Sequence, residues 1–366
     1  MAIVRVTCFR QDQPFRDGPY VVSGARVSEG FDSLVVRLTD ESGTAGWGEM
    51  SPLGTTYDPA FAAGARAAAA ELAPALLGES ADQPIALTRL LDRALKGHPY
   101  AKSAFDMAAW DLAARRAGVP LADLLGGRYG EGTALYRSLS KEAPGAMAAR
   151  AQKYWSEGYR RLQVKIGGDA FEDEASLRAV AGALPSDAVL FCDANGGYAP
   201  AEARRFLALT HELNYAFEQP CATLRECLLL RGTAERPLVL DESIVDLESL
   251  CQAAFAGVDG VTLKIARIGG VTRTRLLRDA AVELGLMVTV EDTGGADIDT
   301  AAMAHLSLST PEARRQHTVD FHNWVTASNG RGLPPTSGGL LRVPDGPGLG
   351  VVVDLSALGE PLLDLG

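Results

Sequence analysis

The sequence predicts an α/β protein: a (β/α)8 barrel of the TIM type with an N-terminal α+β capping domain, which the C-terminal tail completes. Three observations predict this fold. Residues 1–60 alternate between apolar and polar as strands do, and from about residue 131 short β-rich runs alternate with helical stretches. The 366 residues are also too many for one ordinary core. An open, doubly wound sheet is the structural alternative.

The predicted domains are residues 1–130 for the cap, 131–332 for the barrel and 333–366 for the tail. In the cap, periodicity separates strands from helices. Strands are expected at residues 3–6, 33–38 and 45–49, loops at 16–30 and 50–59, and helices at 60–76, 84–96 and from 100 to just before Gly118. The tail is rich in Pro and Gly and then alternates over residues 349–353, so we expect it to return to the capping domain.

Eight strand–helix units follow in the predicted barrel. The strands are expected near residues 132–138, 161–166, 188–193, 215–218, 237–241, 259–264, 286–291 and 317–321. Helical patterns fill the gaps between them, as at residues 171–184, 200–213 and 271–285. Eight such units are typical of a closed barrel with parallel strands.

Ionisable residues end five consecutive strands of this barrel, the second to the sixth. They are Lys165, Asp193, Glu218, Asp241 and Lys264, and they are separated by 28, 25, 23 and 23 residues, each about one βα unit. Side chains at the C-terminal ends of barrel strands converge on one face, where barrel enzymes have their active sites. The sequence therefore predicts that these five side chains form one site.

Three of the five residues, Asp193, Glu218 and Asp241, are carboxylates from adjacent strands. An all-oxygen ligand set suits a hard divalent cation, and we expect one Mg²⁺ per subunit. The absence of His and Cys at these positions disfavours zinc. The alternative is structural, because an acid that closes a strand often caps the next helix.

The two lysines, Lys165 and Lys264, end the second and sixth strands and should face each other across the barrel mouth. A lysine buried beside a cation is a suitable base, because burial and the cation both lower its pKa. A planar intermediate on the metal would present one face to each lysine. The alternative is that both lysines only pair with the metal-binding carboxylates.

Composition excludes several other classes of protein. Five scattered cysteines without a CxxC pair argue against a disulfide framework and a zinc site. The net charge of −11 opposes non-specific nucleic-acid binding. No apolar run is long enough to span a membrane, and the N-terminus runs directly into a strand pattern without the layout of a signal peptide. We therefore expect a cytoplasmic protein with a small-molecule partner.

The sequence resembles the enolase superfamily, in particular its muconate-lactonizing-enzyme-like subgroup, over nearly the whole chain. The likeness rests on the helix and turn over residues 101–125, the Lys165 segment, Asp193-Ala194-Asn195, Glu218-Gln219-Pro220, Asp241-Glu242-Ser243 and Lys264-Ile265-Ala266-Arg267-Ile268-Gly269-Gly270. The resemblance implies a cap that lends two loops to the barrel mouth and Mg²⁺ on the three carboxylates. It also implies a first step in which a carboxylate on the metal becomes an enediolate, and a symmetric homo-oligomer, an octamer or a dimer.

One departure from the subgroup is visible, because Gln163 stands where a lysine usually lies two residues before the base. A cation that would depress the pKa of Lys165 is therefore missing. The seventh strand ends in Glu291-Asp292 without a histidine, which disfavours the mandelate-racemase type of base.

Five stretches carry a closer likeness within the subgroup: Gly18-Pro19-Tyr20, Gly46-Trp47-Gly48-Glu49, Tyr100-Ala101-Lys102-Ser103-Ala104, Leu162-Gln163-Val164-Lys165 and Arg267-Ile268-Gly269-Gly270. In them the sequence resembles enzymes that act on proline derivatives, namely cis-3-hydroxy-L-proline dehydratases and hydroxyproline-betaine epimerases. The first expectation is a lyase that eliminates water to give 1-pyrroline-2-carboxylate, and the second is 2-epimerisation of a betaine or another amino acid derivative. The eighth strand contains Asp320 and His322, which alternation should aim the same way. An inward Asp320 would pair with a secondary ammonium, favour the lyase and repel the dianion of a muconate cycloisomerase, whereas Trp324 keeps the betaine alternative open.

Several further residues are candidates for binding the substrate. Tyr20 and Tyr57 in the cap loops are expected to close over it, although each could simply pack against the barrel rim. The other candidates are Gln163, Asn195, Asp292 and Thr293, which lie near the ends of the second, third and seventh strands. A catalytically retired barrel used for binding or structure is the alternative outside the enzymes, but no metal or base position is visibly lost.

Overall fold

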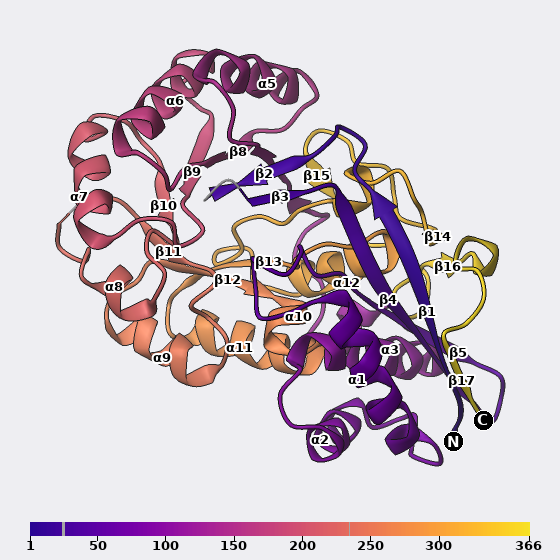
Figure 1. Ribbon diagram of the computed structural model, residues 1–366. Coiled ribbons are helices and arrows are strands. Elements are labelled where there is room, and N and C mark those ends of the chain that lie inside the picture. The colour runs from indigo at the N-terminus through magenta and orange to yellow at the C-terminus, as the bar shows by residue number, and fades with distance from the viewer. Residues whose placement is uncertain (24–25, 234) are drawn as a thin grey trace.

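The computed structural model describes residues 1–23, 26–233 and 235–366. Two sheets organise them. A four-stranded sheet has the order β17-β1-β4-β5, and a seven-stranded sheet has the order β13-β12-β11-β10-β9-β8-β7. Figure 1 shows the first sheet with α1, α2 and α3 on the lower right, and the second, surrounded by α5 to α9 and α11, on the left. The expected combination of a capping unit and a (β/α)8 barrel is confirmed.

The capping sheet is an antiparallel meander to which the end of the chain returns. Its strands are β1 (Ile3–Pro14), β4 (Gly30–Asp40), β5 (Ala45–Met50) and β17 (Leu363–Leu365). In β1, the residues from Val6 to Phe9 are all buried, and the positions after Phe9 alternate between exposed and buried. Because β17 pairs with β1, the two termini lie close together in Figure 1.

Helices cover one side of this sheet: α1 (Ala62–Leu72), the 3-10 helix η2 (Ala73–Leu76), α2 (Pro84–Ala94), α3 (Pro99–Ala117) and the short α4 (Leu121–Leu124). The central α3 is buried along most of its length. It packs directly on β5, where a Cβ added at Gly48 would lie 1.9 Å from the carbonyl oxygen of Ala104. A glycine is therefore required at this contact between strand and helix. The helix ends at Gly118, whose φ of 70° forms a left-handed cap.

The segment expected as a loop over residues 16–30 contains a hairpin of β2 (Tyr20–Val22) and β3 (Arg26–Ser28). Its contacts lie at the barrel mouth, because Ser23 Oγ donates to the carbonyl oxygen of Gly167 at 3.2 Å. The Val21 amide likewise donates to Ser140 Oγ at 3.1 Å. The expectation of an irregular loop was wrong here, since strands of three residues leave too short a pattern to recognise.

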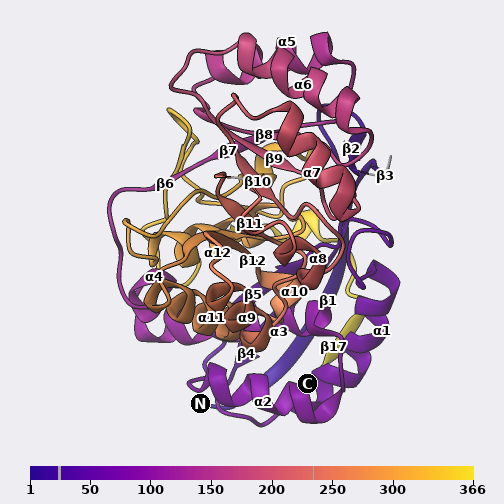
Figure 2. The ribbon, with the colours of Figure 1, turned by 90° about the vertical axis from the view of Figure 1, so that its left-hand side faces the viewer.

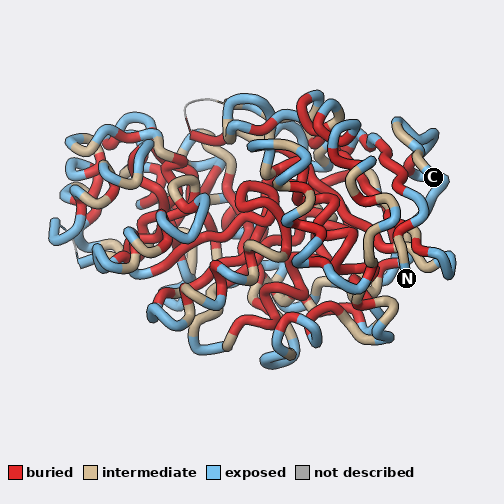
Figure 3. The backbone as a smooth tube through the Cα atoms, turned by 90° about the horizontal axis from the view of Figure 1, so that it is seen from below, coloured by how far each residue is buried: buried red, intermediate tan, exposed pale blue. Residues whose placement is uncertain are grey.

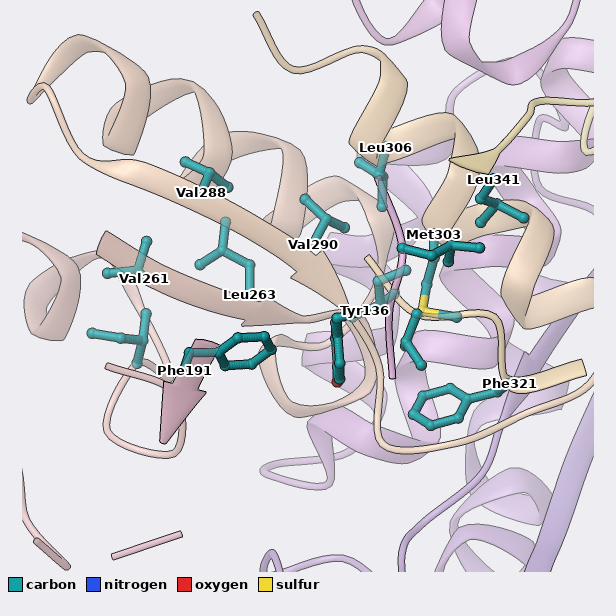
Figure 4. Close-up of a cluster of buried hydrophobic side chains, with 14 of the residues drawn as sticks. Tyr136, Phe191, Val261, Leu263, Val288, Val290, Met303, Leu306, Phe321 and Leu341 are labelled. Atoms are coloured by element: carbon teal, nitrogen blue, oxygen red, sulfur yellow. The ribbon is translucent and has the colours of Figure 1, made fainter. Parts of the chain in front are cut away.

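The barrel strands are parallel and close to their expected positions. They are β7 (Tyr136–Leu139), β8 (Arg161–Lys165), β9 (Val189–Asp193), β10 (Ala216–Glu218), β11 (Leu238–Leu240), β12 (Gly260–Lys264) and β13 (Met287–Glu291). Alternation separates their faces, because Thr262 and Lys264 contact polar groups of the site while Val261 and Leu263 belong to the hydrophobic core. Figure 4 shows part of this core, with Val288 and Val290 of β13 near Met303 and Leu306.

The eighth strand, expected over residues 317–321, is not a regular strand. Its place is taken by a short extended segment, in which Arg315 bridges to Val288 of β13 and Thr318 bridges to Leu135 next to β7. This segment closes the ring. A 3-10 turn, η3 (Phe321–Asn323), follows at once. The expected strand alternation is therefore wrong beyond the bridges, because a 3-10 turn lacks the two-residue period.

Helices surround the barrel and connect its strands. They are α5 (Pro144–Ser156), α6 (Ala170–Gly182), α7 (Pro200–Leu209), α8 (Leu224–Leu228), α9 (Leu247–Phe255), α10 (Ile265–Ile268), α11 (Val271–Glu283) and α12 (Asp297–Leu308). Figure 2 shows α5 and α6 at one end and α2 near both termini at the other. In Figure 3 the buried backbone runs through the middle of the molecule and the exposed turns lie at its edge.

The tail contacts the barrel before it reaches the cap. Its short strands are β14 (Gly330–Arg331), β15 (Leu340–Leu341) and β16 (Val352–Val353), and η4 (Leu355–Ala357) precedes β17. β14 pairs with β16, whereas β15 pairs with β6 (Thr133–Ala134) at the start of the barrel. Within the described ranges, every helix is too short or too polar to cross a bilayer.

Candidate active site

Charged side chains form a row across adjacent barrel strands. Lys165 is the register partner of Asp193, and Asp193 that of Glu218. On the other side of the barrel, Lys264 is the register partner of Glu291. The row is buried, since each of these five side chains is at most 7% exposed. The two lysines are separated by β9, β10 and β11 and therefore stand on opposite walls of the eight-membered ring.

Lys165 forms an ion pair with Asp193, with 2.5 Å between Nζ and Oδ2. Burial alone lowers the pKa of Lys165, but Asp193 and Tyr20 together raise it above the usual lysine range. The expected lowering of the pKa required a cation beside the lysine as well as burial, and with Asp193 alone beside it the carboxylate outweighs burial. Lys165 is held protonated beside Asp193.

Glu218 lies between the other two carboxylates and accepts hydrogen bonds from neutral side chains. Gln163 Nε2 donates to Oε2 at 2.9 Å, and Thr262 Oγ1 donates to Oε1 at 2.9 Å. Burial raises the pKa of Glu218 well above its usual range, and Asp193 and Asp241 raise it further. The three acids are thus close enough to repel one another electrostatically.

Asp241 contacts two cations. Its Oδ1 lies 2.5 Å from Arg267 Nη1, and its Oδ2 lies 3.1 Å from Lys264 Nζ. Although burial raises the pKa of Asp241, Arg267 and Lys264 lower it to about 2. Lys264 also lies 3.1 Å from Glu291 Oε1. Burial lowers the pKa of Lys264, but Asp241 and Glu291 raise it well above its usual value.

Tyr57, from a cap loop, enters this cluster. Its hydroxyl accepts a hydrogen bond from Lys264 Nζ at 2.5 Å and donates to Asp241 Oδ2 at 3.0 Å. Tyr20 lies near the other lysine, with Lys165 Nζ 5.9 Å from its ring centroid. Each predicted cap tyrosine therefore contacts one of the two predicted lysines.

Two residues with strained backbones follow the first and second acids of the row, Asp193 and Glu218. Asn195 has a φ of 45° and Gln219 a φ of 33°, both in the left-handed region. Asn195 Nδ2 donates to Asp193 Oδ2 at 2.9 Å. Gln219 Oε1 accepts from the amides of Asp241 and Ser243, at 3.0 and 3.2 Å. The Asn195 side chain therefore fixes the Asp193 carboxylate, whereas the Gln219 side chain fixes the backbone at Asp241.

A closed cavity of about 30 Å³ lies above this row, and we call it the catalytic cavity. The predicted residues that line it are Tyr20, Tyr57, Gln163, Lys165, Asp193, Lys264, Asp292 and Thr293. Glu218 and Asp241 lie just outside its lining but in contact with it, through Gln163 and Lys264. Asn195 contacts Asp193 from behind.

Asp292 and Thr293 fix the end of the seventh strand. The Asp292 carboxylate accepts hydrogen bonds from the amides of Ala266 and Thr293, at 3.0 and 2.7 Å. Thr293 Oγ1 donates to the carbonyl oxygen of Ser51, which joins barrel to cap at 2.6 Å. Burial raises the pKa of Asp292 to about 6.

Asp320 and His322 do not line the catalytic cavity. The Asp320 carboxylate is fully buried and accepts hydrogen bonds from Tyr159 and Asn323, at 3.0 and 2.8 Å. The His322 amide donates to Thr300 Oγ1 at 3.2 Å. The expected inward Asp320 is therefore wrong, because the chain leaves strand geometry after the bridge at Thr318.

Several residues at the cavity escaped the sequence prediction, namely Tyr136, Glu291, Phe321 and, behind Asp241, Arg267. Tyr136 donates from its hydroxyl to Glu291 Oε2 at 2.6 Å. A signal existed for Glu291, because it ends the seventh strand as the five chosen residues end theirs. Figure 4 shows the Tyr136 ring between those of Phe191 and Phe321.

Asp193, Glu218 and Asp241 are the residues that would hold a divalent cation. Among the residues that the structure describes, no three His, Cys, Asp or Glu side chains are gathered closely enough to form a ready-made metal site. Asp193 and Asp241 instead contact Lys165, Lys264 and Arg267. The chemistry nevertheless fits, because three buried carboxylates whose charges raise the pKa of Glu218 are the environment that a hard dication neutralises.

Comparison with known families agrees with this geometry. Residues 3–126 match the mandelate racemase/muconate lactonizing enzyme N-terminal domain, and residues 146–357 match the enolase C-terminal domain-like family. The chain belongs to the mandelate racemase/muconate lactonizing enzyme family of the enolase superfamily. The resemblance to the enolase superfamily and the predicted fold class are confirmed.

Individual members of this family cover the whole chain. A cis-3-hydroxy-L-proline dehydratase of Roseibium aggregatum is 39% identical over 99% of both chains. A D-Ala-D/L-Ala epimerase of Cytophaga hutchinsonii is 27% identical over 96% of this chain and 95% of its own. A solved enolase superfamily structure from Roseovarius nubinhibens, complexed with magnesium, has a TM-score of 0.92 at 36% identity, over 99% of this chain and 98% of its own.

Proposed function

We propose that the protein is a Mg²⁺-dependent lyase that removes the C2 proton of cis-3-hydroxy-L-proline and expels its C3 hydroxyl group as water. The resulting C2=C3 enamine loses its N–H proton and gains a proton at C3, which gives the cyclic imine 1-pyrroline-2-carboxylate. The observation that carries the proposal is the pair of buried lysines on opposite walls of one cavity, Lys165 on β8 and Lys264 on β12. The 39% identity with the dehydratase supports this choice of substrate.

The stereochemistry of the substrate suits two opposed lysines. In cis-3-hydroxy-L-proline the hydroxyl and the carboxylate share one ring face, so the C2 proton lies on the face opposite the hydroxyl. Elimination is then anti, and it needs a base on one face of the ring and an acid on the other. One lysine takes the C2 proton as a neutral amine, and the other, protonated, gives its proton to the departing hydroxyl.

Asp193, Glu218 and Asp241 would hold Mg²⁺, which supplies the positive charge that stabilises negative charge developing on the substrate carboxylate. The protein's own groups complete the site. Tyr57 orients Lys264 through its hydrogen bond, and Gln163 and Thr262 orient Glu218. Neutralising Asp193 and Asp241 would also weaken the attraction that raises the pKa of Lys165 and Lys264, which favours a neutral amine.

The aromatic side of the cavity accommodates the ring and excludes water. Phe15, Phe31, Phe321 and Trp324 line the cavity opposite its charged row. Their edge-to-face contacts join them, with ring centroids 4.8 Å apart for Phe15 and Phe31 and 5.3 Å apart for Phe321 and Trp324. This apolar side suits the ring carbons of a compact substrate, whose single carboxylate would lie toward the lysines.

The decisive experiment incubates the protein and Mg²⁺ with cis-3-hydroxy-L-proline in D₂O and follows the C2 signal and the product by NMR. The lyase gives the cyclic imine. Single Lys165→Ala and Lys264→Ala variants then separate the roles: the base is the lysine whose loss abolishes C2 exchange, and the acid is the one whose loss abolishes dehydration but leaves exchange. Absence of both exchange and imine in the wild-type protein refutes the proposal.

Epimerisation at C2 is the second candidate, because one lysine can remove a proton and the opposite lysine return it. The epimerase relative supports this alternative. Its signature is an inverted configuration at C2 with the hydroxyl group retained.

The argument from Asp320 against a muconate dianion does not hold, since Asp320 lies outside the catalytic cavity. Retention of all five charged strand ends argues against a retired barrel.

A further inference from the structure

A second cavity of about 50 Å³ adjoins the catalytic cavity, and we call it the outer cavity. The two share Phe15, Tyr20 and Trp324 in their linings, so these residues stand between them. Beyond them, Arg137 and Ser138 line the outer cavity only. The residues that separate the catalytic cavity from the outer cavity therefore limit the length of a bound substrate.

The partition is a pair of aromatic rings from distant parts of the chain. Tyr20 comes from the β2–β3 hairpin of the cap, and Trp324 follows the eighth barrel segment. Their ring centroids are 5.4 Å apart with the planes at 77°. The Tyr20 hydroxyl is 2.7 Å from Ser138 Oγ, and its ring lies next to Lys165. We call Tyr20 and Trp324 together the aromatic wall.

The backbone and the side chain of Trp324 are held by different contacts. The Trp324 carbonyl oxygen accepts from the Arg16 amide at 2.7 Å, and a bridge between Phe15 and Val325 follows. The indole nitrogen, in contrast, has no hydrogen-bond partner among the described residues. Stacking therefore sets the position of the indole, and Arg137 lies over it at 4.7 Å from the ring centroid.

Arg137 is itself a buried anchor, with 8% of its surface exposed. Its Nη1 lies 3.6 Å from Asp320 Oδ1, and its guanidinium lies 5.1 Å from the ring of Tyr154 and 5.8 Å from that of Tyr159. The charged group is thus fixed on the side of Trp324 that faces away from the catalytic cavity. Asp320, which the sequence suggested as a substrate ligand, contacts Arg137 instead.

We propose that the aromatic wall determines substrate length, admitting compact amino-acid carboxylates and rejecting extended ones, and that Arg137 is the positioning residue that keeps Trp324 in the wall. This inference rests on the proposed function. An extended substrate would need the volume that the indole occupies, and one misplaced group in a closed pocket lowers kcat/KM by about tenfold or more. Removing the indole joins the two cavities, and removing Arg137 frees the indole to move.

The test compares compact and extended substrates on defined variants. The compact probe is cis-3-hydroxy-L-proline, and the extended probes are its N-acetyl and N-succinyl derivatives and a series lengthened at ring carbon 4. Trp324→Ala opens the wall, Trp324→Phe keeps a ring, Arg137→Met removes the charge at similar volume and Arg137→Lys restores a cation. Arg160→Met is the matched control, because Arg160 stacks on Trp155 at 4.2 Å on the exposed surface.

We expect Trp324→Ala and Arg137→Met to shift the ratio of kcat/KM between extended and compact probes about tenfold or more toward the extended ones in at least one series. For the compact probe, Arg137→Met should raise KM more than it lowers kcat, and Arg137→Lys should recover part of the loss. The control should keep the wild-type ratio. An unchanged ratio in both Trp324→Ala and Arg137→Met overturns the inference.

Calorimetric titration of the same probes with Mg²⁺ keeps the test independent of turnover. If the wild-type protein binds the compact probe without dehydrating it, the proposed function fails while the ratio of dissociation constants still decides the role of the wall. A ratio that moves with Trp324→Ala and Arg137→Met supports the wall, and one equal to that of the wild type overturns it. Circular dichroism of each variant verifies that it is folded.

Discussion

Replacing His317 by phenylalanine should make the barrel less sensitive to acid. His317 is 7% exposed, its ring stacks on Phe191 with centroids 4.5 Å apart and planes at 20°, and it meets the edge of Tyr136 at 5.1 Å. Burial, with a smaller contribution from Arg161, lowers its pKa from 6.5 to about 3. A phenyl ring can keep both aromatic contacts and cannot be protonated.

The magnitude follows from the difference in proton binding between the folded and unfolded chain. A histidine whose pKa is lower in the folded than in the unfolded chain leaves the unfolding free energy unchanged above the unfolded pKa of 6.5. As the pH falls from there toward the folded pKa of about 3, the unfolded chain binds a proton that the folded chain does not, and the unfolding free energy decreases. At pH 5 the unfolded side chain is protonated in a ratio of about 30 to 1, whereas the folded side chain stays neutral. That ratio corresponds to about 2 kcal/mol.

The assay is urea unfolding followed by circular dichroism at about pH 8 and at about pH 5. The wild-type protein should lose about 2 kcal/mol more unfolding free energy between these values than His317→Phe. Titrations common to both proteins cancel in this comparison. The His211→Asn variant, on a side chain 80% exposed, controls for replacing a histidine as such. Equal losses in wild type and His317→Phe would refute the assignment of His317 as a buried neutral ring.

Three further predictions concern the site and its support. Lys165→Ala or Lys264→Ala should lower kcat for dehydration by roughly 10²-fold or more without unfolding the chain, and wild-type activity in either variant would remove that lysine from the mechanism. Asp193→Asn should weaken Mg²⁺ binding by roughly tenfold or more in a calorimetric titration, and an unchanged affinity would contradict its role as a ligand. Glu49 in the cap accepts hydrogen bonds from the amides of Ala296 and Asp299, at 3.0 and 3.1 Å. Glu49→Ala should therefore cost about 3 kcal/mol of unfolding free energy, and Glu49→Gln less, because the glutamine keeps one acceptor; equal losses in the two variants would contradict this account.

The local sequence pattern was enough to predict the barrel and its row of charged residues. A run of apolar residues that ends in Lys165 or Asp193 predicts both a strand and the residue at which that strand ends. Parallel strands bring such ends together. The same rule applies to Glu291, which ends the seventh strand after an apolar run. The regular spacing of the βα units therefore predicted the fold class and the positions of the candidate metal ligands and lysines.

The surroundings of that row depend on contacts between residues far apart in the chain, and no local pattern encodes them. Asp320 pairs with Arg137 rather than facing the cavity, because the backbone leaves strand geometry after the bridge at Thr318 and turns into η3. Tyr20 and Trp324 meet only because the cap hairpin folds over the barrel mouth. Sequence alone thus determined the repeated βα units of the barrel and what chemistry the ends of their strands carry. Only the tertiary structure decided which side chains close the pocket, since that depends on the packing of the cap against the barrel.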